Sequence, residues 1–580
     1  MNTPIQITRT ERVDDIPLLL AQMAKMNLAA LLDKHFPMHG NWQGLSLGEI
    51  AVVWLAYILS QGDHRLNSVQ GWVAGILMTL TLCLKAEALR ELDFTDDRLA
   101  VVLDRLGQDA DWEAYESEQT SVLLRVYDLK VRRVRIDSTT VKGYVTVTED
   151  GLFQFGHSKE HRPDLPQLKI NQSALDPLGM PLTTTVVSGD HADDPLYVPE
   201  IRKVQACLQQ HGVLYVGDCK MAALGTRCYL AAHQDYYLCP LPEVQMPKAA
   251  LRTLLEPVWA GEQALTPVYR PAETETDQPE HLADGFCYTV TLSADYDGAR
   301  MEWQEKRLAV RSLKQAAAQE KALNARLDKA EKAIADLNLR GRGRKNRDEN
   351  EMLAQVNALL QDHNVVGLLT VEILKETQTV HKRAYGQREA HTETVTTVTV
   401  STSRNPMAYA NAVRSLGWRV FACNDLELSL TEAVLAYREE YLIERGFSRF
   451  RGKTLGITPL FLSSTTRIKG LIRLLSIALR VLCLVEFTAR KALQEQDAKL
   501  DTIYAGNPKR ATTKPTAEKM LRSLRGISLN VIDFNGVKSS FMTPLNAVQM
   551  RILALLGFSP ALYQAIEVQS GELAVKMSER

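Results

Sequence analysis

Hydrophobic positions along the first 125 residues repeat with the period of an α-helix. The segment DDIPLLLAQMAKMNLAALLDKHF places acids ahead of Pro17 and then repeats apolar residues at helical spacing. SLGEIAVVWLAYILSQ begins with a Ser–x–x–Glu capping box at Ser46 and Glu49 and is apolar on nearly all sides, so it predicts a buried helix. We therefore expect a helical N-terminal domain over residues 1–125, interrupted at GDHRL (62–66).

From about residue 130 the period changes to that of a β-strand. VRRVRIDSTTV alternates apolar and polar residues, and QLKINQSALDPLGMPLTTTVVSGD holds two strand-like runs around a turn at Asp176, Pro177 and Gly179. A helical pattern, the short apolar run VLYVGD, a second helical pattern and YYLCPL follow. The order of three strands, helix, strand, helix and strand predicts an α/β fold with a mixed sheet over residues 126–240.

Residues 241–400 interrupt this scheme and predict an inserted domain. Within EKRLAVRSLKQAAAQEKALNARLDKAEKAIADLNL, apolar residues from Leu323 to Leu337 alternate spacings of four and three, which favours one limb of an antiparallel helical hairpin. GRGRKNR would form its cationic tip and ENEMLAQVNALLQDH its return limb. We expect the sheet domain to resume over residues 401–495, with one helix running from near Ser429 through AYREEYLIERGFSRFRGK, and a helical C-terminal region over residues 496–580.

Composition is that of an ordinary globular protein, with 45% apolar and 24% charged residues and a formal net charge of −1. Residues 445–525 are locally basic, with 17 Lys and Arg against 5 Asp and Glu, which is typical of a phosphate-binding surface. The eight cysteines form no CxxC pair. The N-terminal residues lack the apolar core of a signal peptide, and the apolar runs are too short for a bilayer span. We therefore expect a cytoplasmic protein without a membrane partner.

Three acidic residues could meet on one side of the predicted sheet. Asp137 ends the first strand, Asp218 ends the fourth, and Glu444 lies on a later helix whose Ile443, Phe447 and Tyr441 could pack against the sheet. Three carboxylates held together repel one another unless a cation lies among them, and oxygen ligands suit Mg²⁺ or Mn²⁺. Considered singly, each aspartate is more often a turn former or helix cap, and Glu444 would pair with Arg445 or Arg449.

A second group of residues could imitate a metal site. It comprises three histidines and three aspartates in loops: His157, His161, His191, Asp190, Asp193 and Asp194. Their spacing is not that of metal ligands, so roles in turns or in DNA contact are favoured.

The three acids, in this order, resemble the DDE triad of RNase H-like transposases, and the chain is most similar to the bacterial insertion-sequence-four group. That group carries an inserted domain before its Glu and the signature Tyr, two residues, Arg, three residues, Glu, six residues, Lys. The corresponding residues are Tyr437, Glu440, Glu444 and Arg451, so the second and last positions depart from the signature. The segments GHSKEHRPDLPQLKI, GDCKMAALGTR and HGNWQGLSLGEIAVVWLAYILSQGDHRL also resemble segments of that group.

The resemblance implies an RNase H-like catalytic domain, interrupted by an α+β insertion and flanked by helical regions. It implies a bacterial, nucleoid-associated transposase that binds the inverted-repeat ends of its element and joins them to target DNA as a homodimer or larger assembly. Two Mg²⁺ or Mn²⁺ ions would be bound by Asp137, Asp218 and Glu444. The implied DNA-binding residues are Tyr437, Arg438, Arg451, Lys453, Lys159, Arg162 and Lys220. Two alternatives stay open: a domesticated, non-catalytic DNA-binding protein and a metal-dependent nuclease without strand transfer.

Overall fold

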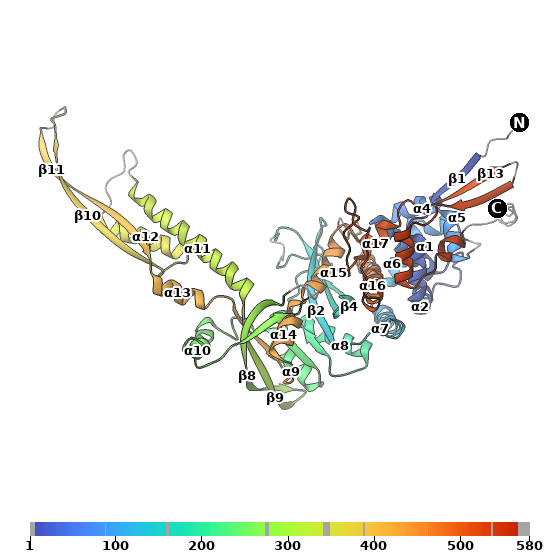
Figure 1. Ribbon diagram of the computed structural model, residues 1–580, viewed down its shortest axis with the longest axis horizontal. Helices are drawn as coiled ribbons and strands as arrows, with labels where there is room; N and C mark the ends of the chain where they lie inside the picture. Colours follow the sequence, from blue (N-terminus) through green and yellow to red (C-terminus); the bar gives the residue numbers. More distant parts are fainter. Residues whose placement is uncertain are drawn as a thin grey trace. The chain divides into compact units, whose positions relative to one another are not determined.

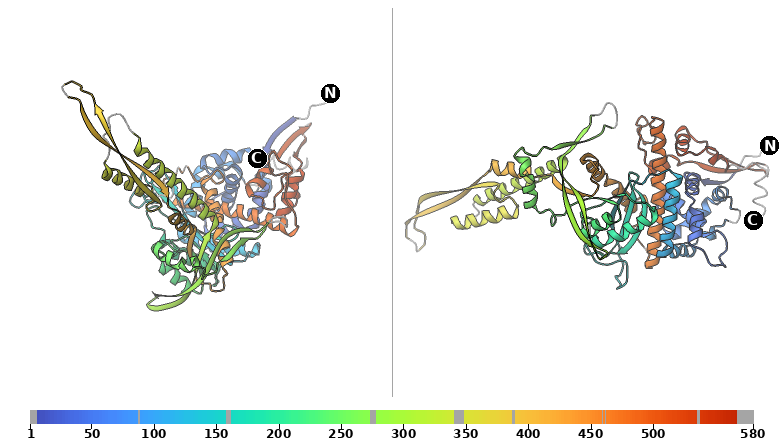
Figure 2. Two further views of the ribbon diagram at one scale, coloured as in Figure 1. Left: turned by 60° about the vertical axis from the view of Figure 1, so that its left-hand side comes forward. Right: turned by 90° about the horizontal axis from the view of Figure 1, so that it is seen from below.

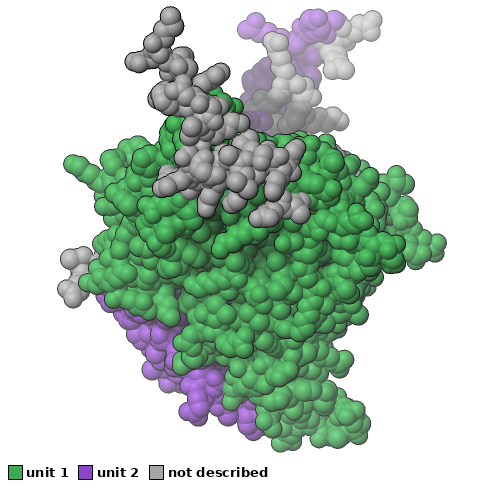
Figure 3. Space-filling view, turned by 90° about the vertical axis from the view of Figure 1, so that its right-hand side faces the viewer, with its two compact units in different colours: residues 1–239, 293–303, 436–580 green, residues 240–292, 304–435 purple. Residues whose placement is uncertain are grey.

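The computed structural model describes residues 6–86, 89–157, 162–272, 278–339, 348–386, 389–458, 460, 462–534 and 537–566. The chain divides into two compact units, coloured separately in Figure 3. Unit 1 comprises residues 1–239, 293–303 and 436–580, and unit 2 comprises residues 240–292 and 304–435. Unit 2 thus includes residues 401–435, which we expected to rejoin the sheet domain. How the chain divides into functional domains stays a prediction.

Five strands of unit 1 form a mixed sheet in the spatial order β4-β3-β2-β5-β6. Strands β2, β3 and β4 are antiparallel, whereas β5 and β6 run parallel to β2. The helices α8 and α9 follow β4 and β5 along the chain, as the sequence pattern predicted (Figure 1). The bounds are β2 Arg133–Lys142, β3 Gln167–Leu175, β4 Met180–Ser188, β5 Leu214–Val216, β6 Tyr236–Pro240, η2 Asp194–Leu196, α8 Tyr197–Leu208 and α9 Leu224–Ala232.

The predicted N-terminal helices are confirmed, including the capping box of α3, in which Glu49 N donates to Ser46 Oγ at 3.2 Å. Of these helices, α1, α3 and α6 pack against the 31-residue helix α16 (Figure 2, right). The bounds are α1 Ile16–Lys25, α2 Leu28–His35, α3 Leu47–Gln61, α4 Leu66–Gly75, α5 Leu77–Leu84, η1 Glu91–Phe94, α6 Asp96–Leu106, α7 Asp109–Val126 and α16 Thr465–Glu495.

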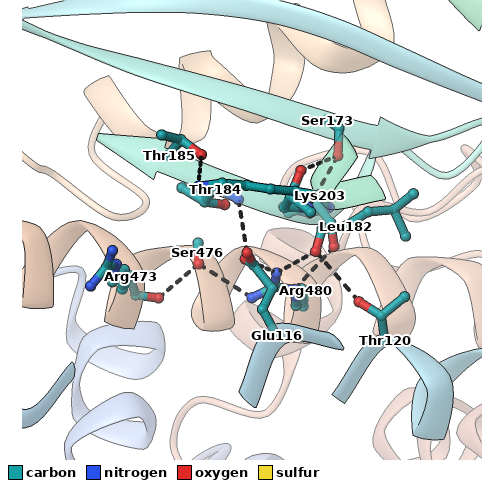
Figure 4. Close-up of polar contacts among 12 residues, drawn as sticks. Glu116, Thr120, Ser173, Leu182, Thr184, Thr185, Lys203, Arg473, Ser476 and Arg480 are labelled. Atoms are coloured by element: carbon teal, nitrogen blue, oxygen red, sulfur yellow. Dashed lines mark hydrogen bonds and ion pairs between the residues drawn. The ribbon is translucent and has the colours of Figure 1, made fainter. Parts of the chain in front are cut away.

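A buried ion pair joins α7, α16 and β4 (Figure 4). Arg480 Nη2 donates to Glu116 Oε1 at 2.5 Å, and Arg480 Nε donates to the Pro181 carbonyl at 3.0 Å. Thr184 N donates to the other Glu116 oxygen at 3.2 Å. Burial raises the pKa of Glu116 to about 7, against the opposing effect of the Arg480 guanidinium. Because removal of one partner would leave a buried charge unpaired, this pair fixes the N-terminal helices against the sheet.

The C-terminal region is not purely helical as expected. It also contributes a hairpin, β13–β14, and β13 pairs with the N-terminal strand β1 in a separate three-stranded sheet. The first strand of the chain and a C-terminal hairpin therefore belong to the same sheet. The bounds are β1 Gln6–Arg12, β13 Ser528–Phe534, β14 Val537–Met542, α17 Ala517–Ser523, α18 Ala547–Leu556 and α19 Ala561–Gln564.

Among the described residues, no single helix has the length and apolar composition of a membrane span. Two pairs of helices, α1 with α2 and α4 with α5, reach that length and composition only when the two helices of each pair are combined, and each pair is bent at its break.

Unit 2 contains a sheet in the order β12-β9-β8-β7. Residues 305–312 belong to β9, in which the consecutive residues Leu308, Ala309 and Val310 are buried. The predicted helix begins only at Leu313. The bounds are α10 Lys248–Trp259, β7 Thr266–Arg270, β8 Glu280–Tyr296, β9 Ala299–Ser312 and β12 Trp418–Cys423.

The predicted helical hairpin is confirmed as α11 and α12, and it belongs to a subdomain with its own core. Leu323, Leu327 and Ile334 of α11 pack with Met352 and Val356 of α12, and with the base of the ribbon formed by β10 and β11. The predicted cationic tip, residues 341–347, lies outside the described residues. The bounds are α11 Leu313–Ala335, η3 Asp336–Asn338, α12 Glu349–Asp362, β10 Leu369–Lys382, β11 His391–Arg404 and α13 Pro406–Arg414.

Excision of this whole subdomain should leave the rest of the chain folded. The ends of the subdomain meet where Ser312 N donates to the Gly417 carbonyl at 2.9 Å, and β9 and β12 already pair from Arg311 and Trp418 onward. Replacing residues 313–416 with Asn-Gly, which favours a two-residue hairpin turn, should retain one cooperative melting transition and a single gel-filtration peak.

Deletion of residues 313–362 alone is the matched control. It exposes the apolar base of the ribbon at Leu369 and Val400 and should cause aggregation. An insoluble or non-cooperative Asn-Gly variant would contradict the assignment of an independent subdomain.

Candidate active site

The parallel register of β2 and β5 brings Asp137 and Asp218 together. It pairs Arg135 with Val216, the last residue of β5, and each aspartate lies two residues beyond that pair. Neighbouring strands lie about 4.8 Å apart, and both aspartates are close enough to Tyr197 to raise the pKa of its hydroxyl. Asp137 is not at the end of its strand as expected. Instead, β2 continues past the end of β5, where Asp137 has no β5 residue opposite it in the register.

Tyr197, the first residue of α8, fixes the Asp218 carboxylate. Its hydroxyl donates to Asp218 Oδ1 at 2.7 Å, and Lys220 N donates to the same oxygen at 2.9 Å. Burial, followed by the charges of Asp218 and Asp137, raises the Tyr197 pKa well above its usual value. A Cβ at Gly217 would lie 3.0 Å from the Tyr197 ring, so glycine permits this close packing. Sequence reasoning missed Tyr197, because its aromatic ring follows the spacing of an ordinary core residue.

Glu444 reaches this site on α15, Tyr441–Arg451. The predicted single helix is divided into α14, Leu430–Arg438, and α15, with Glu440 as the N-cap residue of α15. Ile443 and Phe447 pack against Ala174 of β3, as expected. Tyr441 does not contribute to this packing, because it is 57% exposed.

All three predicted catalytic acids act electrostatically on the carboxyl group of Glu440. Its pKa is raised by burial, then by Asp137 and Glu444, with a further contribution from Asp218. Arg135 acts in the opposite direction but does not outweigh them. Asp137, Asp218 and Glu444, from β2, the end of β5 and the start of α15, each therefore lie within electrostatic range of Glu440. In the sequence, Glu440 stands where the transposase signature has Arg, and its contact with the other acids does not follow from that position alone.

Two arginines of β2 hold the junction between α14 and α15. Arg135 Nε donates to Asp176 Oδ1 at 2.8 Å, and its Nη2 donates to the Ala436 carbonyl. Arg133 forms ion pairs with Asp176 at 2.7 Å and with Glu439 at 2.8 Å. Since side chains two apart on a strand share one face, these arginines and Asp137 project from the same side of β2.

The far side of α15 is held by a second charged network. Arg445 Nη2 lies 2.8 Å from Glu486 Oε2, and Arg449 forms ion pairs with Glu486 and with Glu518, the latter at 2.7 Å. Glu486 and Arg449 are buried. The alternative pairing of Glu444 with Arg445 or Arg449 is therefore not observed: these guanidinium groups bind acids of α16 and α17 instead.

The predicted DNA-binding residues lie in several places within unit 1. Tyr437 and Arg438 are half-buried in the last turn of α14, and Arg451 and Lys453 are exposed at the end of α15 and just beyond it. Arg162 pairs with Asp164 at 2.6 Å, and Lys220 lies 3.5 Å from Asp194. Lys159 lies outside the described residues. DNA contact by these residues stays a prediction.

The loop histidines and aspartates do not form a metal site among the described residues. Asp193 pairs with Lys169 at 2.8 Å, and Asp190 accepts a hydrogen bond from Ser188. His161 lies outside the described residues. Within the part of the chain that the structure describes, no three His, Cys, Asp or Glu side chains, including those around Glu440, are arranged closely enough to hold a metal ion.

The chain matches no family model, and no curated protein matches it. Among solved structures, it is similar to the piggyBac transposase in a cryo-EM structure of a synaptic complex with hairpin DNA. The similarity covers 95% of this chain and 81% of that chain, with 7% sequence identity and a TM-score of 0.31.

Neutralising Glu440 should stabilise the protein at neutral pH in metal-free buffer. The pKa of the Glu440 carboxyl group is higher in the folded state than in the unfolded state, so protonated Glu440 favours folding. This contribution is fully present below the unfolded-state pKa and is lost as pH rises through the folded-state pKa. Glu440→Gln cannot ionise, so its melting temperature should exceed that of the wild type at pH 7 to 8, and the difference should shrink as pH falls toward 4.

Glu439→Gln is the control, because it loses the ion pair with Arg133 and should lower the melting temperature at pH 7. Equal melting temperatures of Glu440→Gln and wild type across this pH range would show that the carboxyl groups do not interact.

Proposed function

We propose that this chain is a DDE-type DNA transposase with an RNase H-like catalytic domain, in which Asp137, Asp218 and Glu444 are the catalytic carboxylates. The observation that carries the proposal is the gathering of these three acids around Glu440. The sheet order supports it, because the first and fourth strands, β2 and β5, are neighbours and carry the two aspartates.

Mg²⁺ or Mn²⁺ fits the chemistry of this donor set. Carboxylate oxygens are the ligands that these hard cations prefer, and the raised pKa of Glu440 supports an excess of negative charge that a cation would relieve. Asp137, Asp218 and Glu444 would hold two such ions. When bound, the ions supply Lewis acidity to the scissile phosphate and lower the pKa of a water molecule.

The neighbouring residues of the chain would orient this site. The Tyr197 hydroxyl and the Lys220 backbone N–H restrain the Asp218 carboxylate through its Oδ1 atom. Glu440 holds its proton to a higher pH than an ordinary glutamate, and in its neutral form it reduces repulsion among the three carboxylates. Arg451 and Lys453, with Tyr437 and Arg438, would hold phosphates or a flipped base near the cut.

The proposed reaction is a pair of phosphoryl transfers. In the first, a water oxygen bonds to the phosphorus at the element end, and the bond to the 3′ oxygen breaks. In the second, the freed 3′-OH attacks a target phosphodiester directly, or after a hairpin intermediate, so one P–O bond forms for each that breaks. Nucleotide hydrolysis is therefore not needed. Two or more copies would hold the paired ends, and this assembly stays a prediction.

Removal of one carboxylate charge should abolish cleavage while end binding persists. Asp137→Asn, Asp218→Asn and Glu444→Gln preserve side-chain shape, and each should slow Mg²⁺-dependent cleavage by at least about 100-fold. Affinity should change little, because phosphate contacts made elsewhere dominate it. The substrate is duplex DNA from the element ends that flank the coding sequence, and cleavage is read on denaturing gels.

Asp128→Asn, at an exposed aspartate ahead of β2 that pairs with Lys130, is the matched control and should cleave normally. Cleavage by Asp218→Asn within tenfold of wild type would exclude the mechanism. Wild-type binding without cleavage would favour a domesticated DNA-binding protein. Cleavage without joining of precut ends to a plasmid would favour a nuclease.

A further inference from the structure

A polar cavity of about 590 Å³ lies between two loops of unit 1 that are distant in sequence. One loop connects α3 to α4 and includes the GDHRL segment. The other follows α15. The cavity is lined by Gln61, Gly62, Asp63, His64, Arg65, Arg451, Gly452, Lys453, Gly456 and Thr458. This lining includes three cationic side chains and no large apolar side chain, so it suits an anionic ligand.

The two loops are joined by direct contacts. The His64 Nε2–H donates to the Gly456 carbonyl at 2.9 Å, since a carbonyl oxygen can only accept. Burial lowers the pKa of His64, so the ring is neutral at physiological pH. Gly62 has a φ of +67°, and a Cβ there would lie 2.8 Å from the Lys453 carbonyl oxygen. Glycine at position 62 therefore permits the loops to close against each other.

The GDHRL loop is also stiffened from within. Asp63 accepts hydrogen bonds from the Tyr57 hydroxyl at 2.6 Å and from Arg65 Nη2 at 2.9 Å. Burial acts to raise the pKa of Asp63, but these hydrogen bonds outweigh it and lower the pKa to about 2. Asp63 is thus ionised and holds the Arg65 guanidinium, whose side chain is 60% exposed, at the cavity. With Arg451 and Lys453, the cavity retains an excess of positive charge.

The cavity is aligned with the carboxylate site along α15. Arg451 lies seven residues after Glu444, which is nearly two full helical turns, so the two residues share one side of the helix about 10 Å apart along its axis. A B-form strand advances about 3.4 Å per nucleotide. A strand whose scissile phosphate lies at Glu444 would therefore bring a second phosphate to the cavity about two to four nucleotides away.

We propose that this cavity is a phosphate-binding subsite that holds the DNA strand beside the cut, and that Arg65 of the N-terminal helical region supplies one wall of it. The inference rests on the proposed function and adds to it a specific role for the GDHRL loop. The N-terminal region would bind the same strand that the carboxylates cleave, so end recognition and cleavage would share one compact unit.

The test measures binding of element-end duplex DNA by Arg65→Ala, Arg65→Lys and wild type as a function of salt. Loss of one phosphate contact should lower affinity about fivefold at 0.15 M salt and reduce the slope of log K against log salt by about 0.9. Arg65→Lys should keep most of that slope.

Lys130→Ala is the matched control, because Lys130 is an exposed cation with an Asp partner two residues earlier, like Arg65, but does not line the cavity. It should bind as wild type does. Melting curves establish that each variant is folded.

A second arm locates the phosphate. Single neutral methylphosphonate linkages are placed along the cut strand, and the position that weakens wild type but not Arg65→Ala marks the contacted phosphate. We expect it two to four nucleotides from the cut. The subsite would be overturned if Arg65→Ala had the same salt slope as wild type and Lys130→Ala, or if no methylphosphonate position weakened wild type alone. Cleavage by wild type would in that case leave the proposed function standing. Failure of wild type to bind the ends would overturn both.

Discussion

Glu440 lies within electrostatic range of Asp137, Asp218 and Glu444, so the structure holds like charges near one another despite their repulsion. Two constraints achieve this. The parallel register of β2 and β5 brings Asp137 beside Asp218, and the packing of Ile443 and Phe447 on β3 fixes α15, which carries the glutamates. Burial is the largest cause of the raised pKa of Glu440, and the charges of Asp137, Glu444 and Asp218 raise it further.

Charged networks on both sides of α15 resist its displacement. The β2 arginines Arg133 and Arg135 hold the junction before it, and Glu486 of α16 gathers Arg445 and Arg449 from its far side. Buried ion pairs contribute little net stability compared with apolar packing, but removal of one partner costs about 3–5 kcal/mol. We therefore interpret these networks as positioning devices: they make displacement of α15 costly, and so they fix where Glu440 and Glu444 lie.

The sequence predicted the order of strands and helices in the sheet domain well, because the strand-like run QLKINQSAL and the short apolar run VLYVGD stand apart from the helical segments around them. It did not reveal the break between α14 and α15, since Glu439 and Glu440 are good helix formers and the break depends on tertiary contacts with Arg133 and Arg135. Tyr197 was also missed, because its hydrogen bond to Asp218 connects elements that no local pattern links. Likewise, only the folded chain brings Arg65 to Arg451.

The central claim is that Asp137, Asp218 and Glu444 form one cation site, and diffraction from crystals soaked in Mn²⁺ tests it most directly. The account predicts an anomalous peak beside Asp137 and Asp218, with carboxylate oxygens at about 2.0–2.2 Å, and loss of that peak in Asp218→Asn. It also predicts that Glu444 lies on the same side of the sheet as this peak. No peak at these carboxylates at millimolar Mn²⁺, or Glu444 on the opposite face, would contradict it.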